Sequence, residues 1–190
     1  MSSALVRVTQ GEVALQDLNG NPITRFQNEW ADMKQQPHWL EKWLQGEYNG
    51  ETHAVTTMRE LLKTLEGQAG KEKAVLVVQQ VLRDEANHIA LIGQLLKVRG
   101  VIPSTSKPFT PLPGMEEPEA GSAKCSYAEA VRAGQIRVVV EDPDTPEDIR
   151  GVFSLILREE SFHERSFRTL AGEQVMFENL DCGQDTCWSK

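Results

Sequence analysis

The chain has 190 residues, of which 39% are hydrophobic and 25% are charged, and its formal net charge is −8. This length favours one domain with its own core, and the composition is ordinary for a globular protein. The acidic balance, without a dense cluster of Lys and Arg, argues against nucleic acid or an anionic membrane as a main partner, and no apolar run is long enough to span a bilayer.

Two features bear on the compartment. Residues 1–10 contain one Arg and no long apolar stretch, so no signal peptide is expected. The three cysteines, Cys125, Cys182 and Cys187, are odd in number and loosely spaced, which argues against a disulfide scaffold. We therefore expect a cytoplasmic protein. The roles of Cys182 and Cys187 stay open between a disulfide, a metal-binding pair and two reduced thiols.

The first 36 residues are expected to form a non-helical N-terminal arm. Short apolar runs at 5–8 and 13–15 are β-like, and a cluster of turn-forming residues occupies 17–22. These runs predict a β-hairpin or an extended segment. At most a short helix is expected here, over 26–34.

Residues 37–171 carry helical apolar periodicity in two pairs of segments. Pro37 suits a first helical turn, and the periodicity predicts helices over about 38–65 and 71–99, separated by a Gly-containing turn. A second pair is predicted from about 126 to before Pro143 and over 146–170. The third helix is the weakest of the four, because Val138–Val140 are β-branched, and a strand at 135–141 is the alternative.

A segment at 101–123 holds five of the nine prolines and separates the two pairs. Such a composition indicates a long crossover. The predicted organisation is therefore an N-terminal arm (1–36), an all-α bundle of four helices (37–171) and a C-terminal tail (172–190).

Two Glu-x-x-His motifs lie within these helices, at Glu85–His88 and Glu160–His163. Residues three apart share one helix face, so each motif can aim a carboxylate and an imidazole inward. Folding the first pair of helices about its turn places position 52 opposite Glu85, and Glu51 is one residue away. Folding the second pair places position 129, which is itself Glu, opposite Glu160.

The predicted site combines four carboxylates with two imidazoles: Glu51, Glu85, His88, Glu129, Glu160 and His163. This set suits a pair of iron ions, with manganese as the alternative. Buried without cations, the carboxylates would repel one another and lose their solvation at high cost. Flanking acids such as Asp84, Glu159 and Glu164 are expected at the surface or as partners that orient metal-bound His.

These motifs resemble the ferritin-like superfamily in its rubrerythrin-like branch. Asn49-Gly50-Glu51-Thr52-His53-Ala54 is similar to a stretch of that branch's first helix, and 84–88 and 159–163 resemble its second and fourth helices. The resemblance covers roughly 38–170. It implies a ferritin-like four-helix bundle and a diiron oxidoreductase that reduces peroxide or activates dioxygen. Because the chain has no Cys-x-x-Cys pairs, electrons would come from a separate donor.

The third helix departs from the family pattern. Aligning Ala133-Gly134 with the family's motif places Gln135 at a position that the family fills with Glu, whereas the spacing argument selects Glu129, and Glu141 is a third candidate. The function also keeps alternatives: a diiron hydroxylase of an organic or tRNA-borne substrate, an iron-binding or storage protein, and a metal-poor helical interaction module. The sequence leaves a homodimer open.

Overall fold

The computed structural model describes residues 5–9, 12–16, 22–105 and 109–172. Its elements in chain order are β1 (Leu5–Thr9), β2 (Glu12–Gln16), α1 (Pro22–Met33), α2 (Trp39–Leu65), α3 (Glu72–Val98), α4 (Pro118–Glu141) and α5 (Glu147–Leu170). β1 and β2 pair antiparallel, with Leu5 opposite Gln16. Helices make up the rest of the regular structure in this described part of the chain, which confirms the expected all-α class. The tail expected from 172 onward, with Cys182 and Cys187, lies outside the described residues apart from Gly172.

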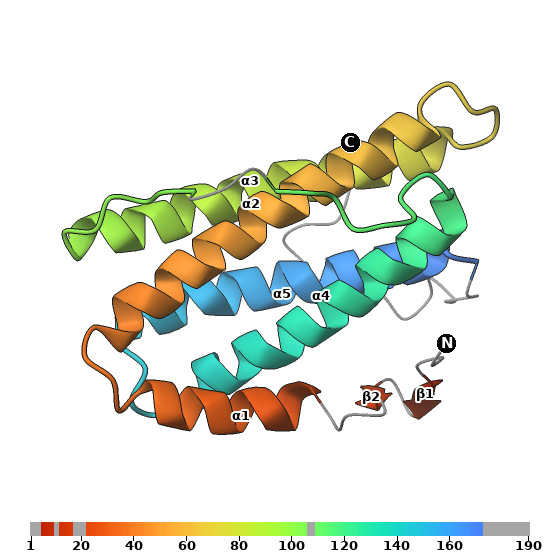
Figure 1. Cartoon of the computed structure of the whole chain (residues 1–190). Helices are drawn as coiled ribbons and strands as arrows, with labels where there is room; N and C mark the ends of the chain where they lie inside the picture. The colour runs from red at the N-terminus through yellow and green to blue at the C-terminus, as the bar shows by residue number, and fades with distance from the viewer. Residues whose placement is uncertain (1–4, 10–11, 17–21, 106–108, 173–190) are drawn as a thin grey trace.

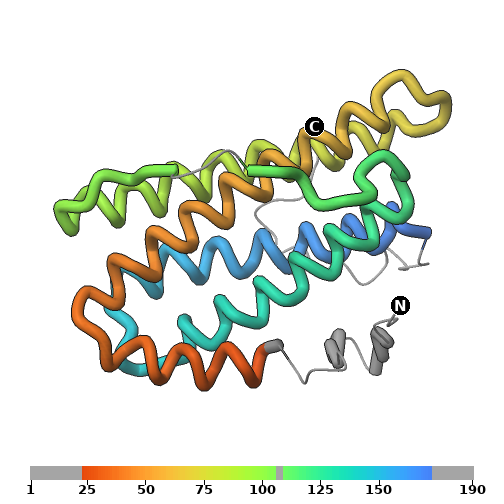
Figure 2. The backbone as a smooth tube through the Cα atoms, viewed as in Figure 1, coloured from red at the N-terminus to blue at the C-terminus, as the bar shows by residue number. Residues whose placement is uncertain are grey.

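The long helices form two antiparallel pairs, α2 with α3 and α4 with α5 (Figures 1 and 2). The pairs meet where α3 lies against α5 and α2 lies against α4, and α1 runs along the outer side of α4. None of the helices described is long and apolar enough to cross a membrane. Each of the four long helices therefore offers one face to a common interior.

The connection from α3 to α4 is held against α2 by hydrogen bonds that follow both segments in the same order. Gln45 Nε2 donates to the Ser104 carbonyl (2.7 Å) near the start of the connection. Thr64 Oγ1 donates to the Met115 carbonyl (2.9 Å) near its end. This path carries the chain along α2 and starts α4 beside the C-terminal half of α2. The crossover predicted at 101–123 is thus present but ends at residue 117.

The start of α4 corrects the sequence expectation. The helix begins at Pro118 rather than near Ser126, and Pro in the first turn is well suited to that position. Its first residues are small and polar and carry little apolar periodicity. A Cβ on Gly121 would lie 3.2 Å from Leu61 Cδ1, so a small residue permits close approach to α2. The alternative strand at 135–141 is wrong, because Val139 is fully buried within a helix whose packing overrides its local preference.

The N-terminal segment is also more helical than expected. Residues 22–33 form α1, which begins four residues before the short helix expected over 26–34. Trp30 is 3% exposed, and its Nε1 donates to Asp142 Oδ2 at 2.6 Å. Lys34, just after the helix, pairs with the same carboxylate at 2.5 Å. These contacts join α1 to the turn between α4 and α5.

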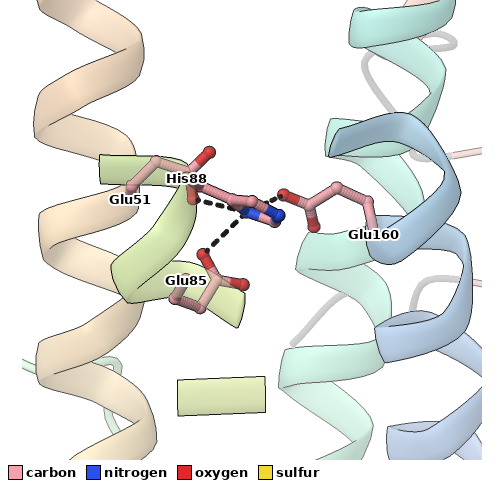
Figure 3. A group of neighbouring side chains, drawn as sticks. All are labelled: Glu51, Glu85, His88 and Glu160. Atoms are coloured by element: carbon pink, nitrogen blue, oxygen red, sulfur yellow. Dashed lines mark ion pairs between the residues drawn. The ribbon is translucent and has the colours of Figure 1, made fainter. Parts of the chain in front are cut away.

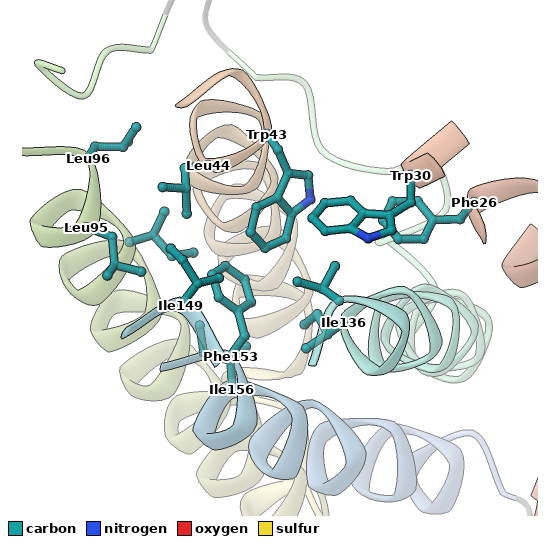
Figure 4. Close-up of a cluster of buried hydrophobic side chains, with 12 residues drawn as sticks. Phe26, Trp30, Trp43, Leu44, Leu95, Leu96, Ile136, Ile149, Phe153 and Ile156 are labelled. Carbon is teal, nitrogen blue, oxygen red and sulfur yellow. The ribbon is translucent and has the colours of Figure 1, made fainter. Parts of the chain in front are cut away.

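The apolar interior is divided into two clusters. The first includes Trp30, Trp43 and Phe153 (Figure 4). The ring centroids of Trp43 and Phe153 lie 4.6 Å apart. The second includes Met58, Leu61 and Phe167. Along every long helix about three to four turns separate the nearest buried members of the two clusters, and those turns carry the buried polar residues of the candidate site.

Candidate metal centre

All six residues predicted from the sequence point into the space between the two apolar clusters. Each is at most 4% exposed, and the two imidazoles are completely buried. They form two overlapping groups, within each of which one ligand atom per residue lies within 4.8 Å of all the others. The first group is Glu51, Glu85, His88 and Glu160, and the second is Glu85, Glu129, Glu160 and His163.

The order of residues along each helix explains this placement. On α2, Leu44 belongs to the first apolar cluster and Met58 to the second, with Glu51 midway between them. On α5, Ile156 and Phe167 bracket the Glu160–His163 motif in the same way. Because the apolar residues on both sides must be buried, the acids and imidazoles between them are carried inward as well.

Three carboxylates surround the inner nitrogen of His88 (Figure 3). His88 Nδ1 lies 3.6 Å from Glu51 Oε2, 3.6 Å from Glu85 Oε2 and 3.7 Å from Glu160 Oε1. These side chains come from α2, α3 and α5, so one half of the site is built by three helices.

The second half is built around His163 and uses the other oxygens of two of the same carboxylates. His163 Nδ1 lies 3.2 Å from Glu85 Oε1 and 3.9 Å from Glu160 Oε2. Glu85 and Glu160 thus each present one oxygen to each imidazole, while Glu51 belongs to the first group and Glu129 to the second. Two shared and two terminal carboxylates are an arrangement that could hold a pair of cations.

The outer nitrogen of each imidazole is held by an acid from the opposite motif. His88 Nε2 lies 2.8 Å from Glu159 Oε2, and His163 Nε2 lies 3.3 Å from Asp84 Oδ2. Each of these acids immediately precedes the glutamate of its own motif in the sequence. An imidazole that donates through Nε2 keeps Nδ1 as an acceptor, so these acids orient the inner nitrogens toward the site. Asp84 and Glu159 thus make the contacts with the imidazoles that the sequence left as one of two possibilities, the other being a place at the surface.

Several atoms of the site lack hydrogen-bond partners, which tests whether the site suits cations. The inner nitrogens of both imidazoles, both oxygens of Glu85 and one oxygen each of Glu51 and Glu160 are buried and make no hydrogen bond to described residues. Leaving so many polar atoms buried without hydrogen bonds is costly in a folded protein. A metal ion in each group would satisfy them, so the residues can hold metal.

Arg132, on α4 one turn after Glu129, is the residue that sequence reasoning missed. Its Nη1 lies 3.0 Å from Glu47 Oε2, its Nε lies 3.1 Å from Glu160 Oε1, and its Nη2 contacts Glu51 Oε1. The guanidinium therefore bridges α2 and α5 from the α4 side. Gly50 leaves room for it, since a Cβ there would lie 3.3 Å from Arg132 Nη1. A glycine next to a predicted ligand was the one local signal that another group approaches closely.

The surrounding charges shift the proton affinity of both imidazoles. Burial alone lowers the pKa of a histidine, but the neighbouring carboxylates outweigh it here and raise the pKa of His88 to about 12 and that of His163 to about 9. The strongest opposing contributions are the hydrogen bonds with Glu159 and Asp84, respectively. In the absence of metal both imidazoles are therefore positively charged at neutral pH, with a proton on each ring nitrogen.

The two terminal carboxylates differ in proton affinity. Burial, followed by the charge of Glu160, raises the pKa of Glu129 well above its ordinary value. Burial is the largest influence on Glu51 and raises its pKa, but the charge of Arg132 together with the contacts to Glu85 and His88 outweighs it, and the net effect is a lowered pKa. Metal ions at this site would therefore displace protons from the imidazoles, and the raised pKa of Glu129 means that they also compete with a proton there.

The structure decides between the three candidates on the third helix. Glu129 is the one that joins a ligand group, as the spacing argument predicted. Gln135 is half-buried and Glu141 is exposed, and both lie outside the two groups. The motif alignment that favoured Gln135 is therefore not followed. Glu164, expected to flank the site, is buried but pairs with Arg168 and lies outside both groups.

A cavity of about 210 Å³ lies beside the site, between α2, the connection before α4, and α4 itself. We call it the α2–α4 cavity. Most of its lining is apolar, from residues such as Ala54, Met58 and Leu112, and Glu129 and Arg132 also line it. The cavity therefore reaches from the molecular surface to one terminal carboxylate of the candidate metal centre.

Comparisons with protein-family models, with curated proteins and with solved structures find no match for this chain. Its function is therefore inferred from the geometry of the site.

Proposed function

We propose that this protein is a non-haem diiron oxidoreductase, built on a ferritin-like four-helix bundle formed by α2–α5, that reduces peroxide or activates dioxygen. The observation that carries the proposal is the pair of overlapping ligand groups that share Glu85 and Glu160. Two Glu-x-x-His motifs on two helices and a single Glu from each of two others are the ligand set of dimetal carboxylate proteins.

The proposed ligands divide between two metal positions. His88 and Glu51 would hold one ion and His163 and Glu129 the other, with Glu85 and Glu160 shared between them. Iron bound there would supply Lewis acidity and a change of oxidation state toward the oxygen species.

The rest of the chain prepares these ligands. Glu159 and Asp84 keep the imidazoles oriented with their inner nitrogens facing the site. Arg132 holds Glu51 and Glu160 in place and offsets part of the negative charge. The two apolar clusters cover the site along the axis of the helices and exclude water from both directions.

Metal analysis tests the proposal most directly. After loading with ferrous iron without oxygen and removal of the excess, we expect two ions per chain. His88→Ala and His163→Ala should each lower the count. His38→Asn is the matched control, because His38 is exposed, belongs to neither ligand group and has a positive φ of 54° that Asn tolerates. A chain that binds no metal under these conditions would overturn the proposal.

Turnover is the second test. The loaded protein should consume hydrogen peroxide when an artificial reductant is supplied, since a separate donor must deliver the electrons. The histidine variants should lose this activity together with their metal, whereas His38→Asn should keep it.

A diiron hydroxylase is the second candidate, and the α2–α4 cavity favours it. An enzyme that oxidises an organic substrate needs space for that substrate beside the metals, and the cavity reaches Glu129. In that case a suitable organic molecule should increase dioxygen consumption and appear in an oxidised form. Peroxide turnover without any such stimulation supports the first candidate.

A further inference from the structure

The α2–α4 cavity is formed where small side chains face one another across two helices. Gly50 and Ala54 line it from α2, and Ala128 lines it from α4. Leu112 closes one side, where its backbone N–H donates to Thr57 Oγ1 at 3.3 Å. A hydrogen bond therefore fixes the wall that the connection contributes, and the wall does not depend on the packing of a single side chain.

The volume limits the size of a ligand. About 210 Å³ is below the range of pockets that take drug-sized molecules, which begins at about 300 Å³. It is somewhat larger than a cavity of about 150 Å³ that takes up benzene. The cavity thus has room for one ring or a short chain with one further substituent.

The charge of the surroundings limits the chemistry of a ligand. Glu129 and Arg132 contribute the acidic and basic side chains of the lining, and Glu129 is buried. Arg132 is already paired with three carboxylates, and their negative charges offset its positive charge, so the cavity offers an anion no net attraction. The remaining walls are largely apolar and would strip the solvation from any charged group, at high cost.

We propose that the α2–α4 cavity binds a small uncharged molecule that consists of one ring with one hydroxyl group, the ring against Ala54, Met58 and Leu112 and the hydroxyl toward Glu129. The carboxylate of Glu129 is 4% exposed and can accept a hydrogen bond from such a hydroxyl. As a substrate assignment this rests on the hydroxylase reading of the proposed function, but the binding itself does not require turnover.

Three probes that differ only in the group attached to the ring test the chemistry: benzyl alcohol, benzoate and benzylammonium. Each is titrated into the purified protein while the amide signals of Ala54, Thr57 and Ala128 are followed by NMR. Benzyl alcohol should shift these signals and bind at least about tenfold more tightly than either ion. If benzoate or benzylammonium binds as well as the alcohol, the assignment to an uncharged molecule is overturned.

A pair of variants on α4 tests the place. Ala128→Trp places a large side chain at an exposed position that lines the cavity, whereas Ala123→Trp places the same side chain at an exposed position of the same helix that does not line it. We expect the first to weaken binding of benzyl alcohol at least about tenfold and the second to leave it unchanged. Ala54→Leu fills the cavity from α2 and gives the same test from a second helix. If Ala128→Trp and Ala54→Leu both bind benzyl alcohol as tightly as the unaltered chain does, the ligand does not bind in the α2–α4 cavity.

Failure of this inference and failure of the proposed function are distinguishable. Binding of benzyl alcohol by a protein that takes up no metal keeps the cavity assignment and removes the oxidoreductase. A protein that binds two metal ions but not benzyl alcohol keeps the proposed metal centre and removes the cavity assignment.

Discussion

Arg132 places a positive charge among the carboxylates of the candidate metal centre. It contacts Glu47, Glu51 and Glu160, and its side chain is 19% exposed. A guanidinium cannot lose its proton in a protein, so this charge is present with or without metal. Arg132 therefore offsets part of the negative charge that the proposed metal ions would also neutralise.

Replacing this charge should destabilise the metal-free chain. Arg132→Met keeps much of the side chain's volume but removes the guanidinium from three carboxylates, and we expect a loss of about 3 kcal/mol in the free energy of unfolding. Arg137→Met is the matched control, because Arg137 is exposed on the same helix, and it should change stability by less than about 0.5 kcal/mol. Urea unfolding measures both. Equal losses in the two variants would show that the ion pairs at Arg132 contribute nothing.

The shifted imidazoles make the stability of the metal-free chain depend on pH. The pKa of His163 is raised to about 9 and that of His88 to about 12, from an ordinary value of 6.5. Below pH 6.5 the folded and unfolded chains both hold these protons. Above it the unfolded chain releases them first, so stability falls by about 1.4 kcal/mol per pH unit for each proton of difference.

The pH prediction is a decline in stability from about pH 6.5 through the pKa of His163 near 9. The raised pKa of Glu129 also makes the stability fall as the pH rises, and this fall begins at a lower pH because the ordinary pKa of a glutamate is lower than that of a histidine. Unfolding in urea at pH 6, 7.5 and 9 measures the decline, and the double variant His88→Gln/His163→Gln should flatten it above pH 6.5. Metal affinity should show the opposite trend and rise with pH, because binding releases these protons.

The acids that orient the imidazoles should affect metal affinity without being ligands. Glu159→Gln and Asp84→Asn keep the size of each side chain but weaken the contact with His88 or His163. We expect each to lower metal affinity by about 10- to 100-fold and to leave the number of ions per chain unchanged. Glu141→Gln, at an exposed position outside both ligand groups, should have no effect. Competition with a chelating dye measures the affinities.

At the scale of elements, α1 depends on a close contact with α4. A Cβ on Gly134 would lie 2.2 Å from Ile23 Cδ1 and 2.9 Å from its Cγ1, so Ile23 occupies the space beside the glycine. Gly151 on α5 is exposed, and a Cβ there would have no atom of a neighbouring residue within 4 Å. Alanine substitutions at the two glycines therefore compare stability where Ile23 is in the way with stability where only helix propensity changes.

Gly151→Ala should stabilise the protein by about 1 kcal/mol, because Ala is the better helix former. Gly134→Ala should gain less than this or should destabilise, because Ile23 has to move. Thermal unfolding measures the difference between the two variants. If both gain equally, the contact between α1 and α4 is looser than the structure indicates.

At the scale of the whole molecule, the candidate centre joins four helices at a point between two apolar clusters. A metal pair bound there would link α2, α3, α4 and α5 at once. Ligands that bind only the folded state stabilise it by mass action, by about 4 kcal/mol when their concentration is about 1,000 times the dissociation constant.

Chelation should therefore lower the unfolding midpoint of the loaded protein in one cooperative transition. The double variant His88→Ala/His163→Ala is the control and should unfold at the same temperature with and without chelator. Calorimetry measures both. A chelator effect of equal size in the double variant would place the stabilising metal elsewhere.

The sequence alone determined the all-α class and indicated that the six predicted ligands lie at a common height along the helices. Helical periodicity identified α2, α3 and α5 to within about one residue, since their apolar faces repeat regularly. Constant helix rise then indicated which residues lie opposite one another across a turn and so favoured Glu129, while Gln135 and Glu141 stayed open until the structure placed Glu129 in a ligand group. Both inferences succeed because they depend on local geometry alone. The diiron chemistry and the ferritin-like arrangement stay predictions.

Only the tertiary structure decided the rest. The start of α4 lacks periodicity, and α1 is held by contacts with α4 and with Asp142, which is 112 positions from Trp30 in the chain. Arg132 reaches Glu51 across 81 positions of sequence, and each imidazole is oriented by an acid from the other motif. Such contacts depend on how the helices are rotated and spaced against one another, which is set by the packing of all side chains together and is not encoded in any short stretch of the chain.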